Sequence, residues 1–291
     1  MLFAVSGDRV LKVKIPSDDP RTEERIRAHY DVERRLARRL READKLQRRS
    51  LYTVLYDDLY RALPDHPQVR VKLSPAVRSA QVAKLVARLA RYVRPDSTFL
   101  EIGPGDCALS VAMAPRCAFV HAVDVTDAAV DAPSLPPNVA LHISDGTTIP
   151  VASDSVDVAF SDQLMEHLHP DDATEQLREI RRALKPGGIY LCITPNRLSG
   201  PHDVSRYFSD VAEGFHIREY TTGEVTALMR RVGFRGVAAA LPARGRLIAA
   251  PPAAFVALEA VLGALPAALR RRFAETAAVR GVLGVRVLAR K

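Results

Sequence analysis

Apolar residues follow two different periods along this chain, and the change falls near residue 97. Before it, they recur every three to four positions, as they do on one side of an amphipathic helix. This period predicts helices over about 23–49, 51–62 and 75–92. Ahead of them, two short apolar runs flank the turn-forming sequence SGD and predict a hairpin over 2–15. The proline-rich stretch 64–68 is expected to be a linker.

After residue 97, short apolar runs alternate with helical segments. The runs predict strands over 98–102, 119–125, 139–143, 156–161 and 188–194. Such alternation is typical of a mostly parallel sheet with helices on both faces. Two more strands are expected over about 234–241 and 284–290. The forty residues between them are too many for a hairpin loop and carry a one-sided apolar pattern, which predicts helices.

Capping residues mark the ends of two helices in this second half. Asp172 and Glu175 have the spacing of a capping box, so a helix is expected to begin there. Thr221 and Glu224 have the same spacing and predict the start of a later helix, which Gly233 would end.

The net charge of +8 is unevenly spread, because basic residues predominate before residue 96 and after residue 245, whereas acidic residues predominate between them. Basic ends favour an anionic substrate, a membrane surface or nucleic acid as partner. The alternative is that solvated arginine-rich helix faces carry the charge.

Cysteine usage and the apolar stretches bear on the compartment. The three cysteines lack paired or metal-type spacing, and the charged N-terminal segment is unlike a secretory signal, so a cytoplasmic protein is expected. The apolar stretch 247–269 contains Glu259 and three prolines, so we expect no transmembrane helix there. Peripheral membrane contact through 247–272 stays open.

The stretch FLEIGPGDCALS, residues 99–110, has the form of a strand followed by a ligand-binding turn. Gly103 and Gly105 would let a ligand approach the backbone N–H groups that open the next helix. Asp124 ends the second strand about twenty residues later, where a ribose-binding acid is expected. These residues indicate a ribose-bearing cofactor, but they fit both a nicotinamide dinucleotide and S-adenosylmethionine.

Glu101 distinguishes the two cofactors. A dinucleotide would place its anionic pyrophosphate beside this carboxylate, and the two would repel each other. S-adenosylmethionine has no phosphate, and its sulfonium and ammonium groups are attracted by a carboxylate. Asp145, at the end of the third strand, could accept a hydrogen bond from an adenine amino group, and Gly146 would leave room for the ring.

Four segments in this order resemble the class I S-adenosylmethionine-dependent methyltransferases, particularly their small-molecule branch: FLEIGPGD, HAVDVTD, LHISDGTTIPVASDSVDVAFSDQLMEHL and LREIRRALKPGGIYLCITPN. The resemblance implies an α/β, Rossmann-like, doubly wound sheet of seven mostly parallel strands with an antiparallel last strand. It also implies S-adenosylmethionine as cofactor. The residues it assigns to cofactor binding are Glu101, Gly103, Gly105, Asp124, Asp145, Gly146 and Asp162. Cys107 departs from the family, which often has a third glycine there.

Candidate general bases follow the fourth and fifth strands, where the family commonly forms its acceptor pocket. His167, His169 and His216 are the leading ones, because imidazole titrates near neutral pH. Each could instead be a packing or loop residue. A metal site built from His167, His169, His202 and Asp203 is conceivable, but no tight ligand spacing demands it, and no metal is expected.

Together these features predict a methyltransferase domain over 75–291, with a helical insertion at 242–283. Residues 1–74 are expected to form a hairpin and helical extension that caps the substrate or contacts a second copy of the chain. The predicted acceptor is a small molecule, methylated on a hydroxyl oxygen of a sugar, a lipid-linked sugar or a phenolic compound. No nucleic-acid partner is expected, since the proline-aromatic motif of amino-methylating DNA enzymes is missing from the sequence. The alternatives are an NAD(P)-dependent oxidoreductase and a non-catalytic S-adenosylmethionine-binding protein.

Overall fold

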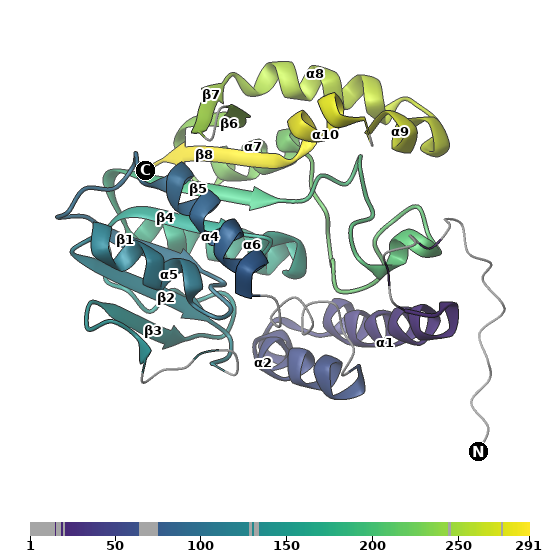
Figure 1. Ribbon diagram of the computed structural model, residues 1–291, viewed down its shortest axis with the longest axis horizontal. Coiled ribbons are helices and arrows are strands. Elements are labelled where there is room, and N and C mark those ends of the chain that lie inside the picture. Colours follow the sequence, from purple (N-terminus) through teal and green to yellow (C-terminus); the bar gives the residue numbers. More distant parts are fainter. Residues whose placement is uncertain are drawn as a thin grey trace.

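The computed structural model describes residues 15, 19, 21–63, 75–127, 130, 134–243, 246–274 and 276–291 (Figure 1). The hairpin predicted over 2–15 and the linker predicted over 64–68 lie outside these ranges, apart from Ile15. The described chain is built around one sheet with helices on both faces, which confirms the predicted α/β class.

The sheet has eight strands in the order β3-β2-β1-β4-β5-β8-β6-β7. In chain order they are β1 Thr98–Ile102, β2 Phe119–Asp124, β3 Val139–Ile143, β4 Val156–Asp162, β5 Leu184–Thr194, β6 Arg235–Ala243, β7 Arg246–Ala250 and β8 Val285–Arg290. β1 to β5 pair in parallel, and β8 lies antiparallel between β5 and β6. The carboxyl ends of the parallel strands therefore meet at one edge, where open α/β sheets bind ligands.

The sheet has one strand more than the sequence predicted. β7 pairs antiparallel with β6, so the insertion expected to be helical over 242–283 begins with a strand. The alternation of burial shows a strand here: Leu247 packs in the core, whereas its neighbours Arg246 and Ile248 are exposed. The rest of the described insertion is helical: α8 Pro252–Gly263, α9 Ala267–Ala274 and α10 Ala277–Leu283.

Alternate residues of β5 supply the two cores of the sheet. Tyr190 and Cys192 face one core with α6 (Pro170–Ala183) and α7 (Thr222–Arg231). Leu191 and Ile193 face the other core with α4 (Pro75–Leu89) and α5 (Ala108–Met113). This two-sided burial follows the period of two along a strand and makes the sheet doubly wound.

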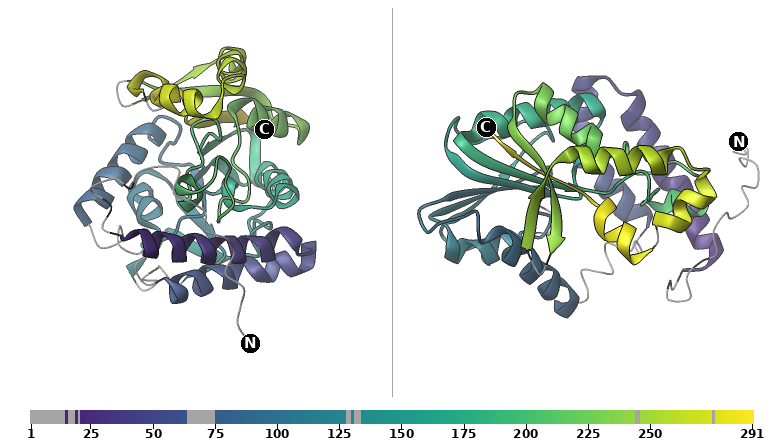
Figure 2. Two further views of the ribbon diagram at one scale, coloured as in Figure 1. Left: turned by 90° about the vertical axis from the view of Figure 1, so that its right-hand side faces the viewer. Right: turned by 90° about the horizontal axis from the view of Figure 1, so that it is seen from above.

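Two helices precede the sheet, and they divide at a different place from the one predicted. α1 is Glu23–Glu42 and α2 is Lys45–Ala62, so the single helix expected over 23–49 is wrong. Ala43 is extended, and Asp44 caps α2 through a capping box with Gln47. The apolar period runs through this break, which hides it. In Figures 1 and 2 these two helices lie together, on the opposite side of the molecule from α8 to α10.

The predicted helix starts met different outcomes. Thr221 and Glu224 form the expected capping box of α7, and Gly233 follows that helix with a φ of 97°. The capping box expected at Asp172 is wrong, since α6 begins at Pro170 and His169 is its N-cap. The Asp172 side chain instead binds Arg48 and Tyr52 of α2.

Several apolar side chains of α8 and α9 face solvent, namely Val256, Val261, Leu269 and Phe273. Within the described ranges, however, no helix combines the length and the apolar character that crossing a membrane requires.

Candidate functional site

A cavity of about 530 Å³ opens at the carboxyl edge of the sheet. One side is formed by the turn after β1, from Ile102 to Asp106, and by the end of β2, from Val123 to Thr126. The opposite side comes from three residues of α2 (Tyr52, Tyr56 and Asp57), and four residues after β4 (Gln163, Leu164, His167 and Leu168) complete the wall. The volume falls in the usual range for a small-molecule or cofactor site.

The glycine turn takes the backbone shape that its sequence predicts. Gly103 and Gly105 have φ angles of 70° and 61°, a region that glycine adopts without steric cost. The Gly105 N–H donates to the Asp124 carboxylate at 3.0 Å, and the Val125 N–H donates to the same side chain at 2.7 Å. Asp124 thus ties the ends of β1 and β2 together at the cavity wall.

Cys107 occupies a position that glycine would fill easily. Its φ is 59°, in the left-handed region, and it precedes the first residue of α5. The side chain is fully buried in the protein. Burial, together with the nearby Glu101, Asp124 and Asp106 carboxylates, raises the pKa of the Cys107 thiol to about 12. The cysteine is therefore an inert packing residue in a conformation that favours glycine.

Glu101 lies behind the glycine turn rather than on the cavity surface. Its side chain is buried and accepts a hydrogen bond from the Ser110 hydroxyl at 2.5 Å. Burial raises the pKa of Glu101 to about 7, although the Ser110 hydrogen bond and the charge of Arg78 favour the ionised form. A cation in the cavity would stabilise this carboxylate further.

Of the two residues expected to hold an adenine, Gly146 lines the cavity and Asp145 does not. Asp145 is absent from the cavity lining, and its carboxylate accepts hydrogen bonds from the Thr147 and Thr148 N–H groups at 2.9 and 2.8 Å. Gly146 does line the cavity, with a φ of 85°. The room expected there for an adenine ring is partly taken by Tyr52, since a Cβ on Gly146 would lie 2.8 Å from the ring.

Asp162 ends β4 but does not line the cavity, and burial raises its pKa. The next residue, Gln163, has a φ of 53° and lines the wall, as does Leu164. The backbone therefore turns at Gln163 and presents the two residues after Asp162 to the cavity.

Only one of the three candidate bases reaches the cavity. His167, in the 3₁₀ turn η3 (Met165–His167), lines the wall, and burial lowers its pKa to about 3. His216 is buried beside it, with 5.0 Å between the ring centroids. His169 is separate, because its ring caps α6 by accepting from the Asp171 N–H at 3.3 Å.

Glu166 is a polar residue of the site that we did not single out from sequence. It is fully buried, and one of its oxygens lies 4.0 Å from Nε2 of His167. Burial raises the pKa of Glu166 to about 7. Burial opposes the charged form of His216, but the Glu219 hydrogen bond and the Glu166 charge outweigh it and raise its pKa to about 9. Residue spacing could not have joined Glu166 to His216, fifty residues later.

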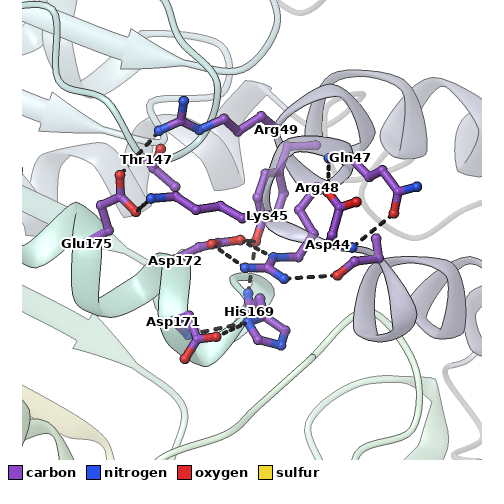
Figure 3. A network of polar contacts seen from close by, with 12 residues as sticks. Asp44, Lys45, Gln47, Arg48, Arg49, Thr147, His169, Asp171, Asp172 and Glu175 are labelled. Carbon is purple, nitrogen blue, oxygen red and sulfur yellow. Dashed lines mark hydrogen bonds and ion pairs between the residues drawn. The ribbon is translucent and has the colours of Figure 1, made fainter.

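A polar network holds α2 against the sheet domain (Figure 3). The Arg48 guanidinium donates to both Asp172 oxygens at 2.6 and 2.8 Å, and both side chains are buried. The Tyr52 hydroxyl also donates to Asp172, at 2.8 Å, and accepts from the His169 N–H at 2.9 Å. Lys45 of α2 forms an ion pair with Glu175 of α6 nearer the protein surface. The network fixes the helix that carries Tyr52 and Tyr56 to the cavity.

Comparison with known proteins agrees with this geometry. Residues 100–192 match a family of methyltransferase domains. A probable S-adenosylmethionine-dependent methyltransferase of Mycolicibacterium smegmatis is 34% identical over 98 residues, which are 34% of this chain and 36% of the relative. One of Mycobacterium tuberculosis is 33% identical over 120 residues, which are 41% of this chain and 42% of the relative. The matches thus span about two fifths of the curated relatives.

A solved structure extends the likeness of the fold to most of the chain. The 1,6-didemethyltoxoflavin-N1-methyltransferase of Burkholderia thailandensis, with bound 1,6-didemethyltoxoflavin and S-adenosylhomocysteine, has a TM-score of 0.52 and 18% identity. The match covers 86% of this chain and 91% of that one. The resemblance to the class I S-adenosylmethionine-dependent methyltransferases is therefore confirmed, in sequence for the segment 100–192 and in fold for most of the chain.

Proposed function

We propose, from the match of residues 100–192 to a family of methyltransferase domains, that this protein transfers a methyl group from S-adenosylmethionine to a hydroxyl oxygen of a small molecule. One observation carries the proposal: a glycine turn lines the cavity, with the buried carboxylate of Glu101 directly behind it. This arrangement favours a cationic cofactor over a pyrophosphate, because a buried charge is poorly screened.

The cavity has room for the cofactor and for part of an acceptor. The open space at Gly105 suits the methionine half, and Asp124 suits the ribose hydroxyls. Tyr52 and Tyr56 of α2 close the opposite side. The N-terminal helices would then cap the reacting groups and exclude water, which strengthens every electrostatic interaction inside.

The acceptor side favours a hydroxyl group that is positioned rather than strongly deprotonated. Nδ1 of His167 lies 3.0 Å from the Phe215 carbonyl, which can only accept, so Nε2 carries the lone pair. The low pKa of this ring keeps it neutral and makes it a weak base. It would accept a hydrogen bond from the acceptor hydroxyl and align its oxygen with the methyl group.

The cofactor is tested by calorimetric titration of the purified chain with S-adenosylmethionine and with NADH. We expect saturable binding of S-adenosylmethionine and no heat from NADH. Tight NADH binding without a response to S-adenosylmethionine would instead identify an oxidoreductase.

The reaction is tested with a panel of sugars, phenols and amines, measuring S-adenosylhomocysteine by mass spectrometry. Turnover is expected with hydroxyl acceptors and is expected to fall at least tenfold in His167→Phe, while the affinity for S-adenosylmethionine changes little. Turnover confined to amines would contradict the hydroxyl assignment. Cofactor binding without turnover on any class would favour the non-catalytic alternative.

A further inference from the structure

Three side chains that bind metals in other proteins meet beside the cavity, and the proposed function uses only one of them. Ligand atoms of Glu166, His167 and His216 all lie within 4.8 Å of one another. Glu166 and His167 belong to η3, whereas His216 lies in the segment between β5 and α7. Folding therefore brings the three groups together from two distant parts of the chain.

Both imidazoles are held through Nδ1, which leaves Nε2 as the nitrogen that could bind a metal. Nδ1 of His167 donates to the Phe215 carbonyl at 3.0 Å. Nδ1 of His216 donates to the Glu219 carboxylate at 2.7 Å. Metal-binding histidines are commonly held in this way, with one ring nitrogen donating to a carbonyl or carboxylate and the other facing the ion.

Glu166 provides a second, independent observation. One oxygen, Oε2, accepts from the Thr194 hydroxyl at 2.8 Å. The other, Oε1, has no hydrogen-bond partner among the described residues, although the side chain is completely buried. Unpartnered buried carboxylate oxygens are uncommon in native structures. Oε1 is the atom that lies 4.0 Å from Nε2 of His167, so it points into the cluster.

We propose that Glu166, His167 and His216 bind a divalent transition-metal ion of the zinc type. Two imidazole nitrogens and one carboxylate oxygen are a typical zinc ligand set, and three protein ligands leave a fourth position open. Since His167 lines the cavity wall, an ion held by the three residues would lie beside the cavity. Zinc–ligand distances of about 2 Å mean that the three ligand atoms approach one another by about an ångström on binding.

If the proposed function holds, the ion would take the place of the hydrogen bond from the acceptor hydroxyl to Nε2 of His167 and would activate the acceptor itself. A hydroxyl bound at the open position loses its proton to water more readily. Its oxygen then attacks the methyl carbon, and a C–O bond forms as the C–S bond breaks and the sulfonium becomes a neutral thioether. This consequence rests on the proposed function, whereas metal binding itself does not.

The site is tested by titrating the metal-stripped full chain with Co²⁺, whose visible absorption reports coordination, followed by displacement with Zn²⁺. We expect one equivalent to bind, with affinity at least tenfold lower in Glu166→Gln and in His216→Asn. His169→Asn is the control in the same loop. The double variant His121→Asn, His142→Asn is a second control, because Nδ1 of His121 lies 2.9 Å from Nε2 of His142 on the neighbouring strand.

Three results would overturn the proposal: no binding to the wild-type chain, binding that survives in both ligand variants, or binding lost in the His121, His142 control. Circular-dichroism melting guards against misfolded variants. Zn²⁺ should raise the melting midpoint of the wild-type chain and leave that of Glu166→Gln unchanged. Neither measurement uses S-adenosylmethionine, so a failed metal site and a failed cofactor assignment give different results.

Discussion

The two walls of the cavity are built in different ways. The wall after β1 is a contiguous stretch from Ile102 to Asp106, in which backbone conformation places the ligand-facing groups, and the Glu101–Ser110 pair lies behind it. The opposite wall joins α2 to the residues after β4, and it depends on contacts over long sequence distances, between Arg48 and Asp172 and between His167 and the Phe215 carbonyl. A short sequence motif thus determines the wall after β1, whereas the opposite wall depends on contacts that form only when the chain folds.

Removing a buried charge should have the largest effect on stability. The charge chosen is that of Arg48, which holds α2 and thereby the wall opposite the glycine turn. Arg48→Met leaves Asp172 buried without its cation, so the free energy of unfolding should fall by about 3 kcal/mol. Denaturant unfolding measures this change. Arg39→Met is the control, because the pair of Arg39 with Asp58 is exposed and its loss should cost less than about 1 kcal/mol. Equal losses in the two variants would show that the Arg48 pair does not anchor α2.

A substitution at Gly146, where Tyr52 contacts the sheet domain, tests how tightly α2 packs against that domain. Gly146→Ala combines an unfavourable φ of 85° with a Cβ only 2.8 Å from the Tyr52 ring, and should cost about 2 to 3 kcal/mol. Gly187→Ala is a matched control, because Gly187 has a φ of 80° and nothing within 4 Å of its added Cβ. The difference between the two losses in thermal unfolding isolates the Tyr52 contact. Equal losses of stability in the two variants would mean that Tyr52 and α2 shift at little cost to accommodate the added Cβ.

Glu101→Gln tests the charge behind the glycine turn without changing the backbone of that turn. At pH 8 the substitution removes a buried negative charge but can keep the hydrogen bond from Ser110, so S-adenosylmethionine should bind roughly tenfold more weakly. Stability at that pH should not fall, because an ionised buried carboxylate is removed. Ser110→Ala is the control that keeps the charge, and its affinity should lie closer to the wild-type value. Unchanged affinity in Glu101→Gln would remove the charge argument.

Cys107→Gly should have the smallest effect, within about 1 kcal/mol in thermal unfolding. Relief of the left-handed backbone at a φ of 59° favours glycine, and loss of the buried side chain opposes it by a similar amount. A destabilisation well above this size would show that the thiol has a packing role that outweighs the backbone cost.

Most of the sheet and the whole glycine turn could be predicted, because their signals are local. The β1 turn carries its conformation in Gly103 and Gly105, and the apolar runs marked β1 to β5 to within a few residues. The boundary between α1 and α2 was missed, because the apolar period continues through Ala43 and only the Asp44–Gln47 capping box reveals it. β7 was missed because a short alternating strand beside an alanine-rich segment resembles a helix.

The residues of the candidate site also differ in how far they could be predicted from local sequence. The sequence indicated Gly103, Gly105 and Asp124, all of which line the cavity. It could not indicate the directions of side chains on separate elements. Asp145 turned out to bind its own turn, and His169 to cap a helix. Glu166 was not among the predicted site residues, because its unpartnered oxygen and its closeness to His216 appear only after folding.

The pH dependence of S-adenosylmethionine binding tests the central claim, that the Glu101 carboxylate behind the glycine turn selects a cationic cofactor. Burial raises the pKa of Glu101 to about 7, and only the ionised form attracts the cofactor. Calorimetric affinity of the wild-type chain should therefore rise as pH increases from 6 to 8, whereas Glu101→Gln should show a flat profile over the same range. Parallel profiles in the two proteins would contradict the claim.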